Sequence, residues 1–111
     1  MSKKFKISVV VVTRNRKKEV LECLASIKNQ SRRPFEVITV DNDSSDRTIN
    51  AIRKKFPRVK IIRSLKNLGG AGGRNLGIRH SKGDFILFID DDAVADRSMI
   101  SELLKVFEKD K

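Results

Sequence analysis

Short apolar segments alternate with longer amphipathic segments along the whole chain. The first apolar segment, residues 7–13, is almost entirely β-branched, which is typical of a strand buried on both faces of a sheet. Further strands are predicted at 35–40, 59–62 and 85–89, and helices at 16–29, after Asp46 to about 55, up to His80, and at about 97–108. This alternation predicts one α/β domain over residues 1–111, with a mainly parallel sheet and helices on both faces.

Polar and glycine residues mark where these elements begin and end. Asn15 is predicted to cap the first helix, and the Ser44-Ser45-Asp46 segment offers caps for the second. The glycine-rich segment 69–73 is expected to form a loop that leads into the third helix, which Gly83 would close.

Three polar clusters directly follow predicted strands, at residues 13–15, 41–43 and 90–92. The carboxyl ends of parallel strands meet at the same edge of a sheet, and ligands of such folds bind beyond that edge. We therefore expect these clusters to converge on one rim, although they are far apart in the sequence.

The chain has 25 Lys and Arg residues against 14 Asp and Glu, and this formal charge of +11 favours nucleic acid, anionic lipid or phosphorylated ligands as partners. The single cysteine, Cys23, excludes an internal disulfide, so a reducing compartment is the simpler expectation. No apolar stretch is long enough to span a bilayer, and no signal-peptide pattern follows the N-terminal charges. We expect a cytoplasmic protein, with contact at the inner face of the membrane left open.

Asp90, Asp91 and Asp92 directly follow the apolar segment 85–89. Three adjacent carboxylates repel one another, so at least one would keep its proton unless a cation compensates. The compensator that we expect is a divalent ion with oxygen ligands that already carries phosphates. The alternative is an acidic turn before the last helix, which suits Asp96 but not a carboxylate at the end of a buried strand.

Two further segments supply candidate binding residues. Asp41 or Asp43 could accept a hydrogen bond from a nucleotide base while Asn42 supplies an amide, although these residues also fit a turn and a helix cap. Backbone N–H groups of the glycine segment, which includes Gly70, favour an anion, and the guanidinium of Arg74 suits a diphosphate. The segment lacks the Lys-Ser/Thr pair of a P-loop, so a flexible connection is the other interpretation.

Four segments together resemble the N-terminal, nucleotide-sugar-binding half of the inverting family 2 glycosyltransferases, which have the Rossmann-like GT-A fold. The matching segments are Val9 to Arg16, Val40 to Thr48, Asn67 to Ile78, and Phe88 to Ala93. Their order and spacing extend over nearly the whole chain. The Asn-Leu-Gly-Gly-Ala-Gly-Gly segment is similar to that of members that transfer rhamnose or galactofuranose.

The resemblance implies that residues from all four segments bind the nucleotide sugar: Thr13, Asn15, Asp41, Asp43, Gly70, Arg74, Asp90 and Asp91. Thr13 and Asn15 would border the base, and Asp41 would hydrogen-bond to it. The three aspartates match the family's Asp-x-Asp motif, in which Asp90 and Asp92 would bind Mg²⁺ or Mn²⁺ together with the diphosphate. The metal would neutralise the departing nucleoside diphosphate.

Members of this family continue beyond the Asp-x-Asp segment into an acceptor-binding region that holds the catalytic base. This chain ends at Lys111, so we expect that it lacks that region, that it has no catalytic base, and that it transfers no sugar by itself. The resemblance implies a nucleoside-diphosphate sugar as donor and a glycan, lipid-linked or other hydroxyl compound as acceptor. An exposed edge beyond the fourth strand would also favour self-association.

Two other functions compete with glycosyl transfer. A non-catalytic basic module could bind RNA or an anionic membrane through its excess of Lys and Arg. However, aromatic residues interleaved for base stacking are absent, so no specific nucleic acid is expected as a partner. A phosphatase or receiver domain would need its essential aspartate after a different strand, which leaves the donor-binding domain as the favoured interpretation.

Overall fold

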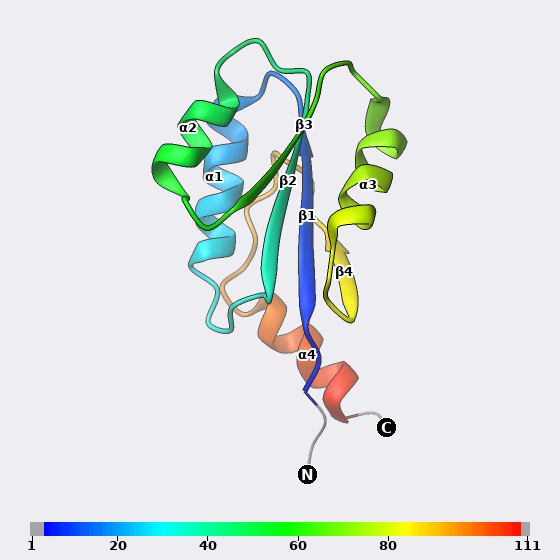
Figure 1. Cartoon of the computed structure of the whole chain (residues 1–111). Helices are drawn as coiled ribbons and strands as arrows, with labels where there is room; N and C mark the ends of the chain where they lie inside the picture. The colour runs from blue at the N-terminus through cyan, green and yellow to red at the C-terminus, as the bar shows by residue number, and fades with distance from the viewer. Residues whose placement is uncertain (1–3, 110–111) are drawn as a thin grey trace.

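The fold is a four-stranded parallel sheet with helices on both faces (Figure 1). The computed structural model describes residues 4–109. In chain order the elements are β1 (Ile7–Thr13), α1 (Lys17–Lys28), β2 (Glu36–Asn42), α2 (Thr48–Lys55), β3 (Lys60–Ser64), α3 (Gly69–His80), β4 (Phe85–Phe88) and α4 (Met99–Lys109). The predicted α/β class, the parallel sheet and the order of the elements are confirmed.

The strands are arranged in the order β3-β2-β1-β4. The chain builds outward from β1 to β3 and then crosses to the other side of β1, so the strand order reverses between β1 and β4. Ligands of open parallel sheets bind at such a reversal, beyond the carboxyl ends of the strands. Thr13 and Asp41 are register partners at the carboxyl ends of β1 and β2. Two of the three predicted polar clusters are therefore adjacent.

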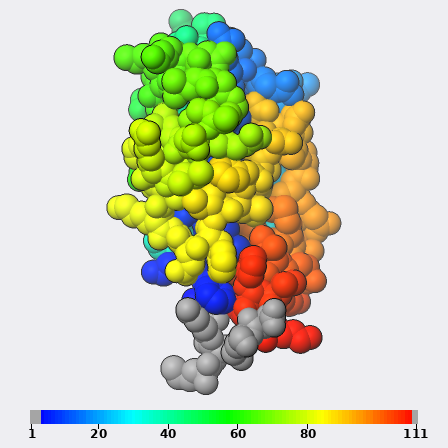
Figure 2. Space-filling model, turned by 90° about the vertical axis from the view of Figure 1, so that its right-hand side faces the viewer, coloured from blue at the N-terminus to red at the C-terminus, as the bar shows by residue number. Residues whose placement is uncertain are grey.

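Alternate residues of the central strand β1 face the two helical layers. Val9 and Val11 belong to the larger core cluster, which includes buried residues of α1 and α4. Val10 packs with β2 residues on the opposite face, beneath α3. Figure 2 shows the α3 side of the molecule, with the segment after β4 and helix α4 lying along one side. A strand buried on both faces explains why β1 is apolar at almost every position.

The segment between β4 and α4 carries the three aspartates near its start, and helix α1 fixes its path. The Ser26 hydroxyl oxygen accepts a hydrogen bond from the Ala95 N–H at 2.9 Å. The buried Gln30 amide donates to the Asp96 carbonyl at 2.6 Å and accepts from the Ile100 N–H at 3.0 Å. The aspartate segment thus leaves the sheet along α1 instead of projecting freely into solvent.

The two edges of the sheet are formed by β3 and β4, and neither edge is paired within residues 4–109. Phe88 at the end of β4 is 42% exposed. The expected open edge is therefore present, while self-association through it stays a prediction. None of the helices in residues 4–109 combines the length and the apolar character that crossing a membrane requires.

The glycine segment forms the first turns of α3, which corrects the expected loop. Ideal Cβ atoms at Gly73 and Gly77 would lie 2.6 Å from Val12 Cγ1 and 2.5 Å from Val10 Cγ1. Glycine at these positions therefore lets the helix approach the sheet more closely than any other residue would. The glycine-rich segment predicts a loop because glycine is a poor helix former. In the structure, close packing of α3 on the sheet outweighs the low helix propensity of these glycines.

Two predicted helix ends are also wrong. Asn15 does not cap α1: it has a positive φ of 53°, and the cap position is occupied by Arg16 without a side-chain hydrogen bond. Gly83 does not close α3, which ends at His80 with an extended Ser81. A Cβ at Gly83 would lie 2.6 Å from Ser8 Oγ, so glycine is needed there for close approach to β1. The remaining boundaries differ from the prediction by only a few residues.

Candidate functional site

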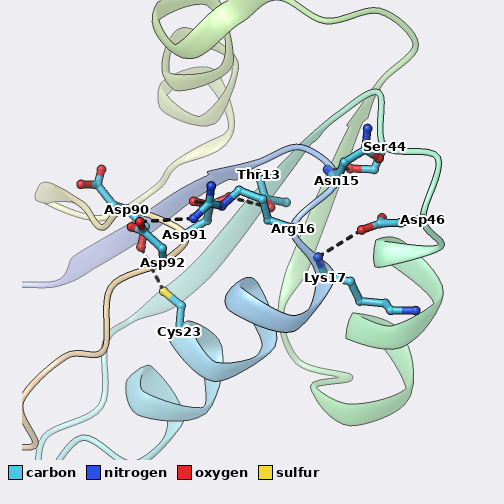
Figure 3. Close-up of polar contacts among 10 residues, drawn as sticks. All are labelled: Thr13, Asn15, Arg16, Lys17, Cys23, Ser44, Asp46, Asp90, Asp91 and Asp92. Atoms are coloured by element: carbon cyan, nitrogen blue, oxygen red, sulfur yellow. Dashed lines mark hydrogen bonds and ion pairs between the residues drawn. The ribbon is translucent and has the colours of Figure 1, made fainter.

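The carboxyl ends of β1 and β4 are joined by polar contacts of Asp91 and Asp92 (Figure 3). The Thr13 hydroxyl donates a hydrogen bond to Asp91 Oδ2 at 2.9 Å. The Arg16 guanidinium lies 3.3 Å from Asp91 Oδ1 through Nε and 3.3 Å from Asp92 Oδ2 through Nη2. One arginine thus pairs with two adjacent carboxylates of the acidic segment.

Asp91 holds its proton more tightly than a free aspartate. Burial of its carboxyl group raises the pKa, and the charges of Asp92 and Asp90 raise it further. The Thr13 hydrogen bond and the Arg16 charge oppose this shift without cancelling it. Burial is the largest cause of the raised pKa, and the repulsion among the three carboxylates that the sequence predicts adds to it at Asp91.

Asp90 and Asp92 are exposed, unlike Asp91. Figure 3 shows the Asp90 side chain turned away from the Arg16 guanidinium. The backbone oxygen of Asp90 accepts a hydrogen bond from the buried Cys23 thiol, with 3.4 Å between sulfur and oxygen. Burial, together with the three nearby aspartates, raises the pKa of Cys23 to about 12. Cys23 is thus a protonated packing residue on the buried face of α1.

Asp41 carries an unused hydrogen-bond acceptor inside the protein. Its side chain is 1% exposed, and its Oδ2 accepts from the Ser44 N–H at 3.3 Å. Its Oδ1 is buried and has no hydrogen-bond partner in the described part of the chain. A buried acceptor without a partner costs about 1–3 kcal/mol, so a ligand N–H that reached this oxygen would recover that energy.

The turns that follow β1 and β2 are fastened to each other. The Asn15 N–H donates to Ser44 Oγ at 2.9 Å, and Asn15 Oδ1 accepts from the Ser45 N–H at 2.7 Å. Asp43, with a positive φ of 61°, lies in the second turn. Asn15 and Asp43 therefore shape the rim above Asp41, and Asn15 is engaged within the protein.

Asp46 joins the same two turns to the helices behind them. One of its carboxylate oxygens accepts from the Lys17 N–H at 3.1 Å in the first turn of α1, and the other accepts from the N–H and hydroxyl of Thr48 at the start of α2. Burial opposes ionisation of Asp46, but these hydrogen bonds outweigh it and lower the pKa. A single carboxylate thus satisfies the N-termini of two helices.

The Asn42 side chain hydrogen-bonds to the start of α3, which corrects the expectation that its amide contacts a nucleotide base. Its Oδ1 accepts from the Leu68 N–H at 2.8 Å, and its Nδ2 donates to the Gly69 carbonyl at 3.0 Å. Gly69 has a φ of +75°, which favours glycine at this position. These contacts hold the first turn of α3 beside the end of β2.

A crevice of about 320 Å³ lies at the reversal of strand order. It is lined by Val10, Val12, Arg16, Gly70, Arg74, Phe88, Ile89, Asp90, Asp91 and Asp92. The crevice thus combines three carboxylates with two guanidinium groups above an apolar floor. A larger groove of about 480 Å³ at the other end of the sheet contains none of the predicted site residues.

The structure therefore brings most of the predicted residues to one rim. Gly70, Arg74 and the three aspartates line the crevice, and Thr13 touches it through Asp91. Asp41, the register partner of Thr13, lies beneath this rim, whereas Asn15 and Asp43 lie on the turns above it.

Arg16 is the functional candidate that the sequence analysis missed. Its position in the first turn after β1 was read as a helix start, and its contacts come from residues 75 and 76 positions away. Three adjacent aspartates require a compensating cation nearby. Arg16, a basic residue just after the strand that neighbours β4, was the signal in the sequence that could have identified it. Pairing with Arg16 provides part of that compensation.

The exposed carboxylates of Asp90 and Asp92 suit a metal ion that is also coordinated by the phosphates of a bound nucleotide. Within residues 4–109, no three His, Cys, Asp or Glu side chains are grouped closely enough to hold an ion by themselves. Mg²⁺ is usually bound through one or two carboxylates plus substrate phosphates and water. Asp90 and Asp92 supply this donor set at the mouth of the crevice, so the residues fit a metal bound jointly with a diphosphate.

Comparison with known proteins places the chain in a family. The sequence profile of "Glycosyl transferase family 2" matches residues 8–111. An uncharacterised glycosyltransferase of Haemophilus influenzae is 41% identical over 103 residues, which cover 93% of this chain and 35% of that protein.

Two solved structures share the fold. S. aureus TarS 1–349 in complex with UDP-GlcNAc has a TM-score of 0.86 and 29% identity, over 94% of this chain and 31% of that one. The mannosyltransferase PcManGT of Pyrobaculum calidifontis, in complex with GDP-Man and Mn²⁺, has a TM-score of 0.83 and 25% identity, over 98% of this chain and 33% of that one. The chain thus spans about a third of the length of these proteins. By its sequence profile and its fold, the chain belongs to glycosyl transferase family 2.

Proposed function

We propose that the chain is the donor-binding domain of a glycosyltransferase that transfers a sugar from a nucleoside diphosphate to an acceptor hydroxyl with inversion. The observation that carries this proposal is the composition of the crevice, which Arg16 and Arg74 line together with Asp90, Asp91 and Asp92. Guanidinium groups suit diphosphate oxygens, and carboxylates suit sugar hydroxyls and divalent metals. The complexes of related proteins with UDP-GlcNAc and with GDP-Man and Mn²⁺ support the same donor class.

Each part of the donor has a matching group in the chain. The unpaired Oδ1 of Asp41 accepts a hydrogen bond from the base, beside Thr13. Arg74 binds the diphosphate from α3, and Arg16 binds it from the start of α1. Asp91, held by Thr13, accepts from the ribose. The arrangement orients the donor along the ends of β1, β2 and β4.

Asp90 and Asp92 would hold Mg²⁺ or Mn²⁺ together with the diphosphate. When bound, the metal supplies Lewis-acid stabilisation of the nucleoside diphosphate as it leaves. Asp92 is paired with Arg16, so the guanidinium would be released toward the phosphates if Asp92 held the metal. Deprotonation of the acceptor hydroxyl needs a base, and we assign that role to no residue of this chain.

Titration calorimetry with UDP tests the proposal. We expect UDP to bind in the presence of Mn²⁺ and to bind much more weakly when the metal is chelated. Asp92→Ala should abolish the metal-dependent part of the affinity, because it removes an exposed carboxylate of the proposed metal site. Asp96→Ala is the matched control, since within residues 4–109 the exposed Asp96 carboxylate contacts only its own turn.

Equal affinity for UDP with and without metal would contradict the role of Asp90 and Asp92. Metal-dependent binding that survives in Asp92→Ala would place the ion elsewhere. RNA binding with a steep salt dependence, unaffected by Asp92→Ala, would instead favour a non-catalytic basic module.

A further inference from the structure

The larger groove lies at the opposite end of the sheet from the donor crevice. It is formed where α1 and α2 end and where β2 and β3 begin, and its volume is about 480 Å³. Apolar side chains form most of its lining, among them Leu24, Ile27, Val37, Phe56 and Val59. Such a groove can take an apolar ligand segment, because burying apolar surface on both sides is favourable.

The rim of the groove is cationic. Lys28, Arg33 and Arg58 line it with exposed side chains, and none of the three forms an ion pair with a carboxylate within residues 4–109. The Lys28 ammonium lies 5.9 Å from the centre of the Phe56 ring, directly above the apolar lining. Three cations at the mouth of an apolar groove match a ligand with an anionic head and an apolar tail.

One carboxylate also lines the groove, but it is already engaged. Glu36 Oε2 accepts from the Ser8 hydroxyl and from the Lys82 N–H, each at 2.6 Å. These contacts hold it toward β1 and the segment after α3. The net charge that a ligand head meets at the rim is therefore positive.

The wider surface beside the groove strengthens this field. Residues 47–83 contain eleven Lys or Arg and no Asp or Glu, so this segment accounts for the whole formal charge of +11. The segment comprises α2 on one face of the sheet, the edge strand β3, and α3 on the other face (Figure 1). Lys60, at the start of β3, reaches the C-terminus of α3 through a 3.4 Å hydrogen bond to the His80 carbonyl. Lys60 directly follows Val59 of the groove lining, so its charge adds to that of the rim.

We propose that this groove binds an anionic phospholipid at a bilayer surface. The phosphate lies among Lys28, Arg33 and Arg58, an acyl chain packs on the apolar lining, and the β3 edge of the sheet faces the surrounding anionic headgroups. A lipid suits the groove better than a nucleic acid, because the chain has no Trp or Tyr for base stacking and the lining is mostly apolar. The donor crevice then points away from the membrane.

A tryptophan placed at the groove tests this assignment in the full chain. Phe35 lines the groove and is 48% exposed, and the natural sequence has no Trp or Tyr, so Phe35→Trp supplies the only such fluorophore. With vesicles of phosphatidylcholine and phosphatidylglycerol in equal amounts, its emission should shift to the blue and be quenched by brominated acyl chains. Vesicles of phosphatidylcholine alone should cause neither change. Val94→Trp, at a 73% exposed position after β4, is the control and should show no quenching.

The cations are tested in the same Phe35→Trp background. The double substitution Lys28→Gln with Arg58→Gln should weaken vesicle binding about 30-fold, because each cation near an anionic surface contributes about fivefold. Lys18→Gln with Arg97→Gln removes the same charge from exposed positions outside the groove and the segment 47–83. That control should weaken binding far less.

Three outcomes would overturn the proposal: no response to phosphatidylglycerol, equal losses in both charge variants, or the same emission shift with inorganic phosphate or RNA in place of vesicles. UDP affinity distinguishes this proposal from the proposed function. The groove variants leave the donor crevice intact, so they should bind UDP as the parent chain does, whether or not vesicle binding is lost.

Discussion

At the scale of single residues, the candidate site is defined by carboxylates that lack some of the hydrogen bonds or opposite charges that would stabilise their ionised form. Asp41 has one carboxylate oxygen without a partner, and Asp91 keeps a raised pKa despite contacts with Thr13 and Arg16. Both groups are buried or half-buried at the ends of strands. Incomplete satisfaction of this kind costs stability and is characteristic of sites that complete their contacts with a ligand.

Replacing Asp41 with Asn should reduce nucleotide affinity without weakening the fold. The Ser44 N–H would still donate to the amide oxygen of the new residue. The NH₂ group would then occupy the position of the unpaired Oδ1. A donor there cannot accept from a base N–H, so we expect UDP affinity to fall about 10- to 100-fold, as for the loss of a charged hydrogen bond. Asp43→Asn, at the other carboxylate that could accept from the base, is the comparison variant and should lower affinity less. If calorimetry showed the larger loss in Asp43→Asn, Asp41 would not be the base contact.

Replacing Arg16 with Gln should raise the pKa of Asp91 further, because its guanidinium favours the charged carboxylate. The folded pKa of Asp91 already lies above its unfolded value, so protonated Asp91 favours the folded state, and this contribution is lost as the pH rises through the folded pKa. In Arg16→Gln that loss should move to higher pH. A carboxyl ¹³C titration by NMR measures the shift, with Arg14→Gln as control. An unchanged Asp91 titration in Arg16→Gln would show that the ion pair does not form in solution.

At the scale of secondary-structure elements, the chain shows which signals sequence reasoning can use. The β-branched strand β1 and the amphipathic helices α1 and α4 were predicted correctly, because one-dimensional periodicity reports directly on burial. The start of α3 was not, because Gly73 and Gly77 serve contacts with β1 that lie outside any local window. Asn15 was likewise misassigned, since its partners Ser44 and Ser45 come from another turn.

Substituting alanine for Gly77 should destabilise the protein, although alanine is the better helix former. The new Cβ would meet Val10 Cγ1 at 2.5 Å, on a stiff side chain within the sheet. Overpacking of this kind costs about 1–3 kcal/mol, which exceeds the gain of about 1 kcal/mol in helix propensity. At Gly70 the nearest atom is Arg74 Nη1 at 3.8 Å, so Gly70→Ala should leave stability unchanged or raise it. Urea denaturation compares the two, and equal effects would contradict the close packing of α3 on β1.

At the scale of the whole molecule, the parallel topology creates the site. Asp91 lies 50 residues after Asp41 and 78 residues after Thr13 in the sequence, yet the strand register and the crossover to β4 bring all three to one rim. That convergence was predictable, since the rule for parallel sheets needs only the strand ends. The pairing of Arg16 with Asp91 and Asp92 was not, because it depends on the path of the chain after β4 along α1.

Paramagnetic broadening of amide NMR signals by Mn²⁺, recorded with and without UDP, tests the central claim most directly. If a metal and a diphosphate are held jointly at the strand ends, Mn²⁺ with UDP should broaden signals from residues 13–16, 70–74 and 89–92. Signals around Lys28, Arg33 and Arg58, at the other end of the sheet, should stay sharp. Broadening that ignores UDP, or that centres on the groove end, would contradict the account.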